Sequence, residues 1–168
     1  MELQIEYLSD HKDLIPTVAR WVYGEWSSIM PYDSLEEWTR DLEGRLRRGQ
    51  IPTTFVALLG DQPVGCASLV EHDLETHRHL SPWLAEVYVC PAYRRRGIGS
   101  ALVRRAAEQA RALGIKTVYL YTFDREKFYA RLGWSTWERT EGHAERITVM
   151  KQELDSQNHQ QNRAGKGE

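Results

Sequence analysis

The sequence predicts a mixed α/β (α+β) fold, in which strands and helices alternate around one central sheet. Strand-like and helix-like segments follow one another along most of the 168 residues. Strand-like runs at 53–59 and 64–71 flank the turn Gly60-Asp61-Gln62-Pro63, which predicts an early hairpin, and a second pair of strands is expected near the end. Between them, the strand-like run 83–89 breaks into a glycine turn and then a helix.

The N-terminal third is predicted to form one strand and two helices. Leu3, Ile5 and Tyr7 alternate with polar residues, which is typical of a strand. One helical face is then formed by Leu14, Val18, Trp21, Val22 and Ile29, with a break expected near Gly24. Ser34-Leu35-Glu36-Glu37 has the form of a capping box and starts a second helix that runs to about Arg48.

The C-terminal half continues the alternation. The helix after the glycine turn buries a stripe formed by Ile98, Leu102, Ala106, Ala110 and Leu113, and Gly114 caps its end. The expected elements after it are a strand at 116–122, a short helix at 125–132 and strands at 134–139 and 147–151. Residues 1–154 are interpreted as one domain, and the polar stretch 155–168 as a disordered tail.

Charge and composition argue against nucleic-acid-binding, membrane-spanning and secreted proteins. The formal net charge is −2, and three adjacent arginines do not make a basic stripe, so nucleic-acid binding is not expected. No apolar run approaches the ~20 residues that span a bilayer, and no signal peptide is recognisable, so a cytoplasmic protein is the default expectation. Cys66 and Cys90 lie in apolar runs and are expected to be buried free thiols.

The segment Arg94-Arg95-Arg96-Gly97-Ile98-Gly99-Ser100 carries the main functional signal. A strand that turns at glycines into a helix leaves backbone N–H groups unpaired at the positive end of the helix dipole, which favours a phosphate or diphosphate ligand. The motif is neither a Walker A loop nor the Gly-x-Gly-x-x-Gly fingerprint. A plain tight turn is the alternative interpretation.

The spacing Arg-x-x-Gly-x-Gly after a Val-x-Pro strand end resembles the acetyl-CoA loop of the GNAT superfamily of N-acetyltransferases. The run Phe128-Tyr129-x-x-Leu132-Gly133-Trp134 is similar to the last helix of that family. The resemblance implies a mostly antiparallel sheet of about seven strands with splayed parallel central strands, flanked by about four helices. It also implies acetyl-CoA as the acetyl donor and a primary amine as the acceptor.

The resemblance assigns cofactor binding to the segments around the glycine turn. The backbone of Val87, Tyr88 and Val89 would pair with the pantetheine arm, and an N–H near Val89 would face the thioester carbonyl. The diphosphate would lie on the turn formed by Arg94, Arg95, Arg96, Gly97, Ile98, Gly99 and Ser100. Pro91 has no N–H and marks the end of strand pairing.

The resemblance also suggests two catalytic residues. Tyr129 would protonate the departing thiolate, because phenol and thiol have similar reference pKa values. Glu86 would take the proton of the amine, and strand alternation places it on the same face as Tyr88. Three alternatives stay open for Glu86: a structural pairing with an arginine, His72 as the base, or deprotonation through ordered water.

The acceptor itself is not readable from the sequence. Small amines are slightly favoured over a protein N-terminus or lysine, and Trp21, Trp26 and Trp38 are expected to form core or to shape the pocket. Carboxylates that are expected to attract a cationic amine are Asp33, Glu36, Glu37, Glu71 and Asp73. The histidines at 72, 77 and 79 predict a solvated polar loop rather than a metal site. A non-catalytic acyl-CoA sensor is the alternative function, and a monomer or a homodimer is expected.

Overall fold

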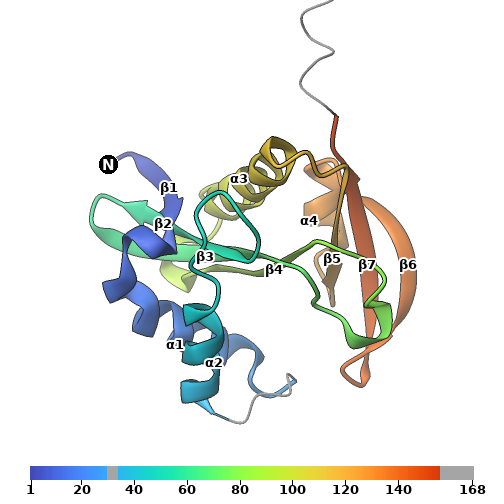
Figure 1. Cartoon of the computed structure of the whole chain (residues 1–168), viewed down its shortest axis with the longest axis horizontal. Helices are drawn as coiled ribbons and strands as arrows, with labels where there is room; N and C mark the ends of the chain where they lie inside the picture. Colours follow the sequence, from blue (N-terminus) through green and yellow to red (C-terminus); the bar gives the residue numbers. More distant parts are fainter. Residues whose placement is uncertain (30–33, 156–168) are drawn as a thin grey trace, which may run out of the picture.

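The computed structural model describes residues 1–29 and 34–155 and contains one seven-stranded sheet with helices on both faces (Figure 1). The strand order is β1-β2-β3-β4-β5-β7-β6. The strands are β1 (Leu3–Tyr7), β2 (Thr53–Leu59), β3 (Gln62–Val70), β4 (Trp83–Val89), β5 (Thr117–Thr122), β6 (Ser135–Gly142) and β7 (Glu145–Glu153). The helices are α1 (Ile15–Trp26), α2 (Leu35–Glu43), α3 (Ile98–Ala112) and α4 (Glu126–Arg131). Short 3₁₀ turns span Leu8–Asp10, Lys12–Leu14, Glu75–His77 and Pro91–Tyr93.

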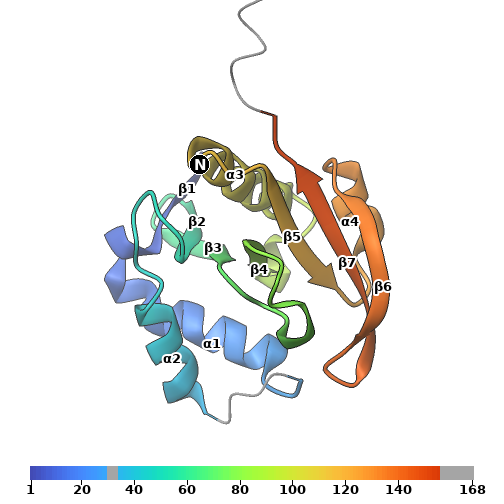
Figure 2. The ribbon, with the colours of Figure 1, turned by 45° about the vertical axis from the view of Figure 1, so that its right-hand side comes forward.

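Neighbouring strands of the sheet are antiparallel except for β4 and β5. This parallel pair is in register only at Trp83 and Tyr119, where the Tyr119 N–H donates to the Pro82 carbonyl at 3.0 Å. Beyond that point the two strands diverge (Figure 2). The prediction of a mixed, mostly antiparallel sheet with a splayed central pair is therefore confirmed.

Two layers of helices bury the two faces of the sheet (Figure 1). Along β2, Phe55 packs into the core on the side of α3, whereas Val56 packs against α1 and α2. The strand is buried through most of its length because both faces are covered. The sheet therefore holds the C-terminal end of β4 rigidly between the two helical layers.

Several element ends differ from the sequence prediction. Helix α1 continues through Gly24. A single glycine inside a helix lowers stability by only about 1 kcal/mol, which is less than the packing of the helix contributes. Helix α2 ends at Glu43, five residues before the predicted Arg48. The chain after it is held by tertiary contacts, including a bridge between Leu46 and Thr53. β7 extends from Glu145 to Glu153 because it pairs with both β5 and β6.

Three further observations concern membrane-spanning helices, the cysteines and the C-terminal tail. Within the two described stretches, no helix has the length and apolar character needed to cross a membrane. Both cysteines are free, with Cys66 buried and Cys90 half-buried. Apart from Asp155, the predicted tail lies outside the described residues.

Candidate active site

The turn between β4 and α3 exposes a row of backbone donors. Arg95 and Gly97 adopt positive φ values of 64° and 80°, and α3 begins directly afterwards without a side-chain cap. The first N–H of this segment with a protein acceptor is that of Ala101, which donates to the Gly97 carbonyl at 3.0 Å. No N–H from Arg95 to Ser100 donates to a residue of the described chain. Such a row of free donors at a helix start is a site for an anion.

The three arginines of this turn have different local roles. The Nε of Arg94 donates to the Val89 carbonyl at 2.9 Å, and its guanidinium lies 5.7 Å from the centre of the Tyr88 ring. Arg96 lies over Tyr93 at 5.4 Å. All three arginines are exposed. Arg94 therefore braces the end of β4 as well as adding positive charge beside the donors.

The C-terminal half of β4 has a hydrogen-bonding partner on one side only. Tyr88 and Val89 pair with Cys66 and Gly65 of β3, while β5 has already separated on the other side. A bulge precedes this segment, because Glu86 and Val87 together face a single residue of β3. Glu86 has a φ of 55°, in the left-handed region. The strand thus leaves a half-buried backbone edge facing the gap between β4 and β5.

The start of α3, the end of β4 and helix α4 meet at Gly99. A Cβ on Gly99 would lie 3.5 Å from Cζ of Phe128 and 3.7 Å from Cγ2 of Val89. Tyr129 follows Phe128 and is 9% exposed, with its ring edge-on to Phe128 and Trp134. Burial raises the pKa of Tyr129 to about 12, although Arg125 acts in the opposite direction. The predicted cofactor turn and the predicted acid are therefore on neighbouring elements.

Glu86 is engaged in a buried ion pair. Its Oε2 lies 2.6 Å from Nη1 of Arg45, and the other amino group of that guanidinium contacts Asp41. The side chains of Glu86 and Arg45 are only 10% and 12% exposed. Burial lowers the pKa of Arg45, but Glu86 and Asp41 together raise it above its ordinary value. The structural pairing that the sequence left open for Glu86 is thus present.

Glu86 lies in a cleft of about 510 Å³ below the sheet. The cleft is formed by the end of α2, the segment after β3, the bulge of β4 and the turn between β6 and β7. It is lined by Trp38, Arg40, Asp41, Gly44, Arg45, Pro52, Val70, Glu71, His72, Asp73, Leu74, Glu75, Arg78, Glu86 and His143. A volume of this size accommodates a small-molecule ligand.

The predicted carboxylates divide into two groups. Glu71 and Asp73 line the cleft, whereas Glu36 and Glu37 do not, and Asp33 lies outside the described residues. Burial, followed by the nearby charge of Glu86, raises the pKa of Asp73 well above its ordinary value. His72, the alternative base, is exposed and also lines the cleft.

The histidine-rich segment after β3 is less solvated than predicted. His77 is buried, with Nε2 2.8 Å from a carboxylate oxygen of Glu138 and Nδ1 2.8 Å from the Thr76 hydroxyl. These contacts attach the segment to β6. The described residues contain no group of three or more histidine, cysteine or carboxylate side chains that would hold a metal ion.

The tryptophans that were expected to form core or to shape the pocket cover the face of the sheet where Glu86 and Tyr88 lie. Trp21 of α1 stacks on Tyr88 with ring centres 5.6 Å apart, and Trp38 of α2 is buried and lines the cleft. Trp26 is half-buried against the core under α1 and α2. Glu86 and Tyr88 therefore reach the same helical layer, as alternation predicted, but Tyr88 does not line the cleft.

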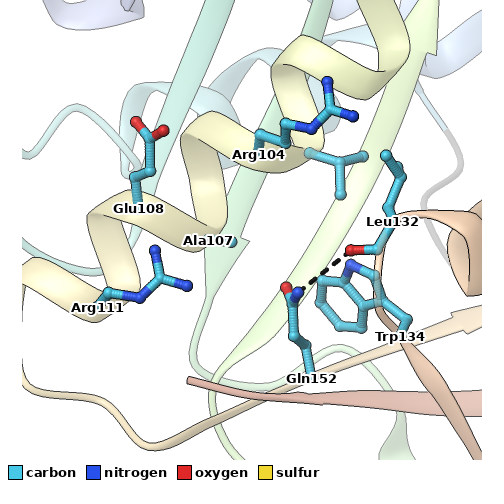
Figure 3. A pocket seen from close by; sticks show the side chains of 8 residues that line it. Arg104, Ala107, Glu108, Arg111, Leu132, Trp134 and Gln152 are labelled. Atoms are coloured by element: carbon cyan, nitrogen blue, oxygen red, sulfur yellow. Dashed lines mark hydrogen bonds between the residues drawn. The ribbon is translucent and has the colours of Figure 1, made fainter. Parts of the chain in front are cut away.

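A second, smaller hollow of about 200 Å³ lies between α3 and the C-terminal strands (Figure 3). Gln152 Nε2 donates to the Leu132 carbonyl at 3.3 Å there, while Gln152 Oε1 and Trp134 Nε1 have no hydrogen-bond partner in the described part of the chain. The hollow contains none of the predicted site residues. One bridging water would suit this unpaired donor and acceptor.

Sequence reasoning missed three residues of the cleft. Asp41 and Arg45 come from α2 and its end. Arg45 reaches Glu86 across 41 positions of sequence, which local patterns do not encode, and its guanidinium also contacts Asp41. His143 was also missed. The signal that could have found it is the unusual sequence of the two-residue turn His143-Ala144, which lacks the asparagine or glycine that such turns favour.

Comparison with known proteins agrees with this architecture. Among solved structures, aminoglycoside 6'-N-acetyltransferase complexed with coenzyme A matches with a TM-score of 0.72 and 16% identity, covering 94% of this chain and 99% of that chain. The protein yncA from Salmonella typhimurium with its cofactor acetyl-CoA matches at 0.67 and 18%, covering 91% and 94%. An acetyltransferase of the GNAT family from Streptococcus pneumoniae matches at 0.64 and 19%, covering 92% and 100%.

At these identities the structural matches show a common fold. A search of the curated proteins found no match. The model of the acetyltransferase (GNAT) family matches residues 15–134, which include the β4–α3 turn, Glu86 and Tyr129. The chain therefore belongs to the acetyltransferase (GNAT) family.

Proposed function

We propose that the protein is an acetyl-CoA-dependent N-acetyltransferase that moves the acetyl group to a primary amine by direct attack in a ternary complex. The observation that carries the proposal is the free row of N–H donors from Arg95 to Ser100 beside the open edge of β4. The solved neighbours that hold coenzyme A or acetyl-CoA support the choice of donor.

The N–H groups of the turn would hold the diphosphate, helped by the positive charge of Arg94, Arg95 and Arg96. The pantetheine arm would run along the unpaired edge of Val87, Tyr88 and Val89, like an added strand. The thioester would then reach the gap where β4 and β5 diverge. A donor near Val89 would stabilise the oxyanion that develops on the carbonyl.

Tyr129 would supply the proton to the departing thiolate. Its pKa of about 12 keeps the phenol protonated at any physiological pH. Glu86, His72 and a chain of ordered water remain the candidate proton acceptors for the amine. Glu86 would have to leave Arg45, or act through water, because its carboxylate is already paired at 2.6 Å.

The cleft next to Glu86 would hold the acceptor. Its volume of about 510 Å³ and its carboxylates Glu71 and Asp73 favour a small cationic amine over a protein N-terminus or lysine. An acyl-CoA sensor without turnover is the second candidate. The buried phenol of Tyr129, which follows the Phe128 that packs against Gly99, favours the enzyme over the sensor.

The test combines binding with turnover. Calorimetry should detect acetyl-CoA binding to the wild type, and thiol release measured with DTNB across a panel of amines should rise above the rate without amine. Gly97→Val should abolish binding and keep the folded circular-dichroism spectrum, because a β-branched residue does not hold a φ of 80° in the turn. Binding without thiol release for any amine would favour the sensor, and no binding at all would contradict both functions.

A further inference from the structure

The turn between β6 and β7 has a backbone conformation that its residues do not favour. β6 ends at Gly142 and β7 begins at Glu145, so His143 and Ala144 form a two-residue loop with φ values of 52° and 63°. Loops of this kind favour Asn-Gly, because side chains with a Cβ are strained at positive φ. Strain of this kind is kept where the side chain has a role in the site.

The hairpin is also pressed against the segment that borders the cleft. A Cβ on Gly142 would lie 2.7 Å from Cδ1 of Ile147 and 3.2 Å from Cδ1 of Leu74. Glycine allows this approach without a shift of either side chain, and His143 follows it at the rim of the cleft that also contains Glu86. The packing of the hairpin therefore determines where the imidazole lies.

One nitrogen of the imidazole is held and the other is free to act. His143 Nε2 lies 3.1 Å from the hydroxyl of Tyr121 on β5, and the two rings are 5.7 Å apart. Nδ1 has no partner among residues 1–29 and 34–155. When Nε2–H donates to the phenol oxygen, the imidazole takes the tautomer in which Nδ1 accepts a proton.

We propose that His143 accepts the proton that the acceptor ammonium loses, and that Tyr121 positions the imidazole by holding its Nε2 at hydrogen-bonding distance. This inference rests on the proposed function and names a different proton acceptor from Glu86, whose carboxylate is paired with Arg45. The phenol remains neutral in this role, because burial, followed by Asp73 and Glu86, raises the pKa of Tyr121.

The ammonium gives one proton to Nδ1, the neutral amine forms a C–N bond with the thioester carbonyl, and the C–S bond breaks. The thiolate takes a proton from Tyr129, the second amine proton replaces it through solvent, and the imidazolium releases its own proton to solvent. The products are the acetamide, the free thiol and one proton.

The charges around His143 come from three other segments. The other titratable groups that line its cleft are Arg40, Asp41 and Arg45 of α2 and its end, Glu71, His72, Asp73, Glu75 and Arg78 after β3, and Glu86 of β4. Arg45 is shared by Asp41 and Glu86, and Arg78 pairs with Glu75 at 3.0 Å. The remaining carboxylates, Glu71 and Asp73, favour a positive charge in the cleft.

His143→Asn tests the inference, since asparagine suits the first position of this turn. With the most rapidly acetylated amine of the panel, kcat should fall at least tenfold at neutral pH. The deficit should shrink as the pH rises past the pKa of that amine, because the amine is then already neutral. The melting temperature should stay equal or rise. Ala144→Gly is the matched control, expected to raise stability and leave kcat unchanged.

Tyr121→Phe adds a readout that does not depend on turnover. NMR of the His143 ring nitrogens should show a changed distribution of the ring proton between Nδ1 and Nε2 in this variant, since the contact at Nε2 is removed. An active wild type with unchanged kcat and pH profile in His143→Asn would overturn the inference and leave the proposed function standing. A wild type that acetylates no amine would overturn both.

Discussion

Tyr129 keeps its hydroxyl proton over the whole range in which acetyl transfer is assayed, because burial raises its pKa to about 12. Its ring packs edge-on against Phe128 and Trp134. In the proposed role, a phenol that is always protonated needs no further activation to donate its proton near neutral pH.

Tyr129→Phe is therefore expected to lower kcat by about 10²-fold, while the dissociation constant of acetyl-CoA changes little. Single-turnover thiol release and calorimetry on the same preparation check the two quantities. Turnover at the wild-type rate would remove Tyr129 as the acid.

The same substitution should change stability at high pH. The folded pKa is raised from 10.0 to about 12, so the stability that this group contributes is intact below pH 10 and is lost as the pH rises toward 12. Urea unfolding between these pH values should show a smaller loss for Tyr129→Phe than for the wild type.

At the scale of the elements, the close approach of β3 to β4 depends on Gly65. A Cβ there would lie 2.6 Å from the Tyr88 carbonyl oxygen and 3.1 Å from Cδ1 of Leu102. The backbone edge of β4 and helix α3 are thus both packed against a position that has no room for a side chain. This contact sets where the open edge of β4 lies relative to the start of α3.

Gly65→Ala should consequently lower the free energy of unfolding by about 1–3 kcal/mol and weaken acetyl-CoA binding, because the strand or the helix must move. Urea unfolding and calorimetry measure the two effects. Gly24→Ala in α1 is the control, since a Cβ there has no neighbour within 4 Å. It should stabilise by about 0.5–1 kcal/mol and leave binding unchanged. Wild-type stability in Gly65→Ala would contradict the steric argument.

The order of the elements was predictable because it depends on local periodicity. Alternation along β1 and the stripe on α3 are each visible within a short window of sequence. The ends were less predictable. α2 stops before Arg48 because Arg45 is drawn to Glu86 and Leu46 bridges to Thr53, and both partners are distant in sequence.

The cleft beside Glu86 is a property of the whole molecule, since five separate segments line it. Its charge is correspondingly a sum over distant residues. Glu71, and Asp73 once it is ionised, supply negative charge at the cleft, whereas Glu36, at the start of α2, is exposed and Glu37 lies outside the lining.

Glu71→Gln and Asp73→Asn should each raise the KM of a cationic amine about 2- to 10-fold, equivalent to roughly 0.4–1.4 kcal/mol, while Glu36→Gln and Glu37→Gln leave it unchanged. Because burial raises the pKa of Asp73, the KM of the wild type should fall as rising pH ionises this group, and the fall should be shallower in Asp73→Asn. Steady-state kinetics across pH check both trends. Equal effects in all four variants would contradict a role for the cleft charge.

By itself, the sequence determined the succession of strands and helices, the glycine turn that leaves donors free at the start of α3, and the context of Tyr129, because each depends on residues close together in the chain. The tertiary structure alone decided that Glu86 is paired with Arg45, that His77 is buried against Glu138, and that His143 reaches the cleft beside Glu86. These contacts join residues 41 to 61 positions apart or meet across several segments. Packing of the complete sheet and its helices brings them together, and no local pattern of residues specifies it.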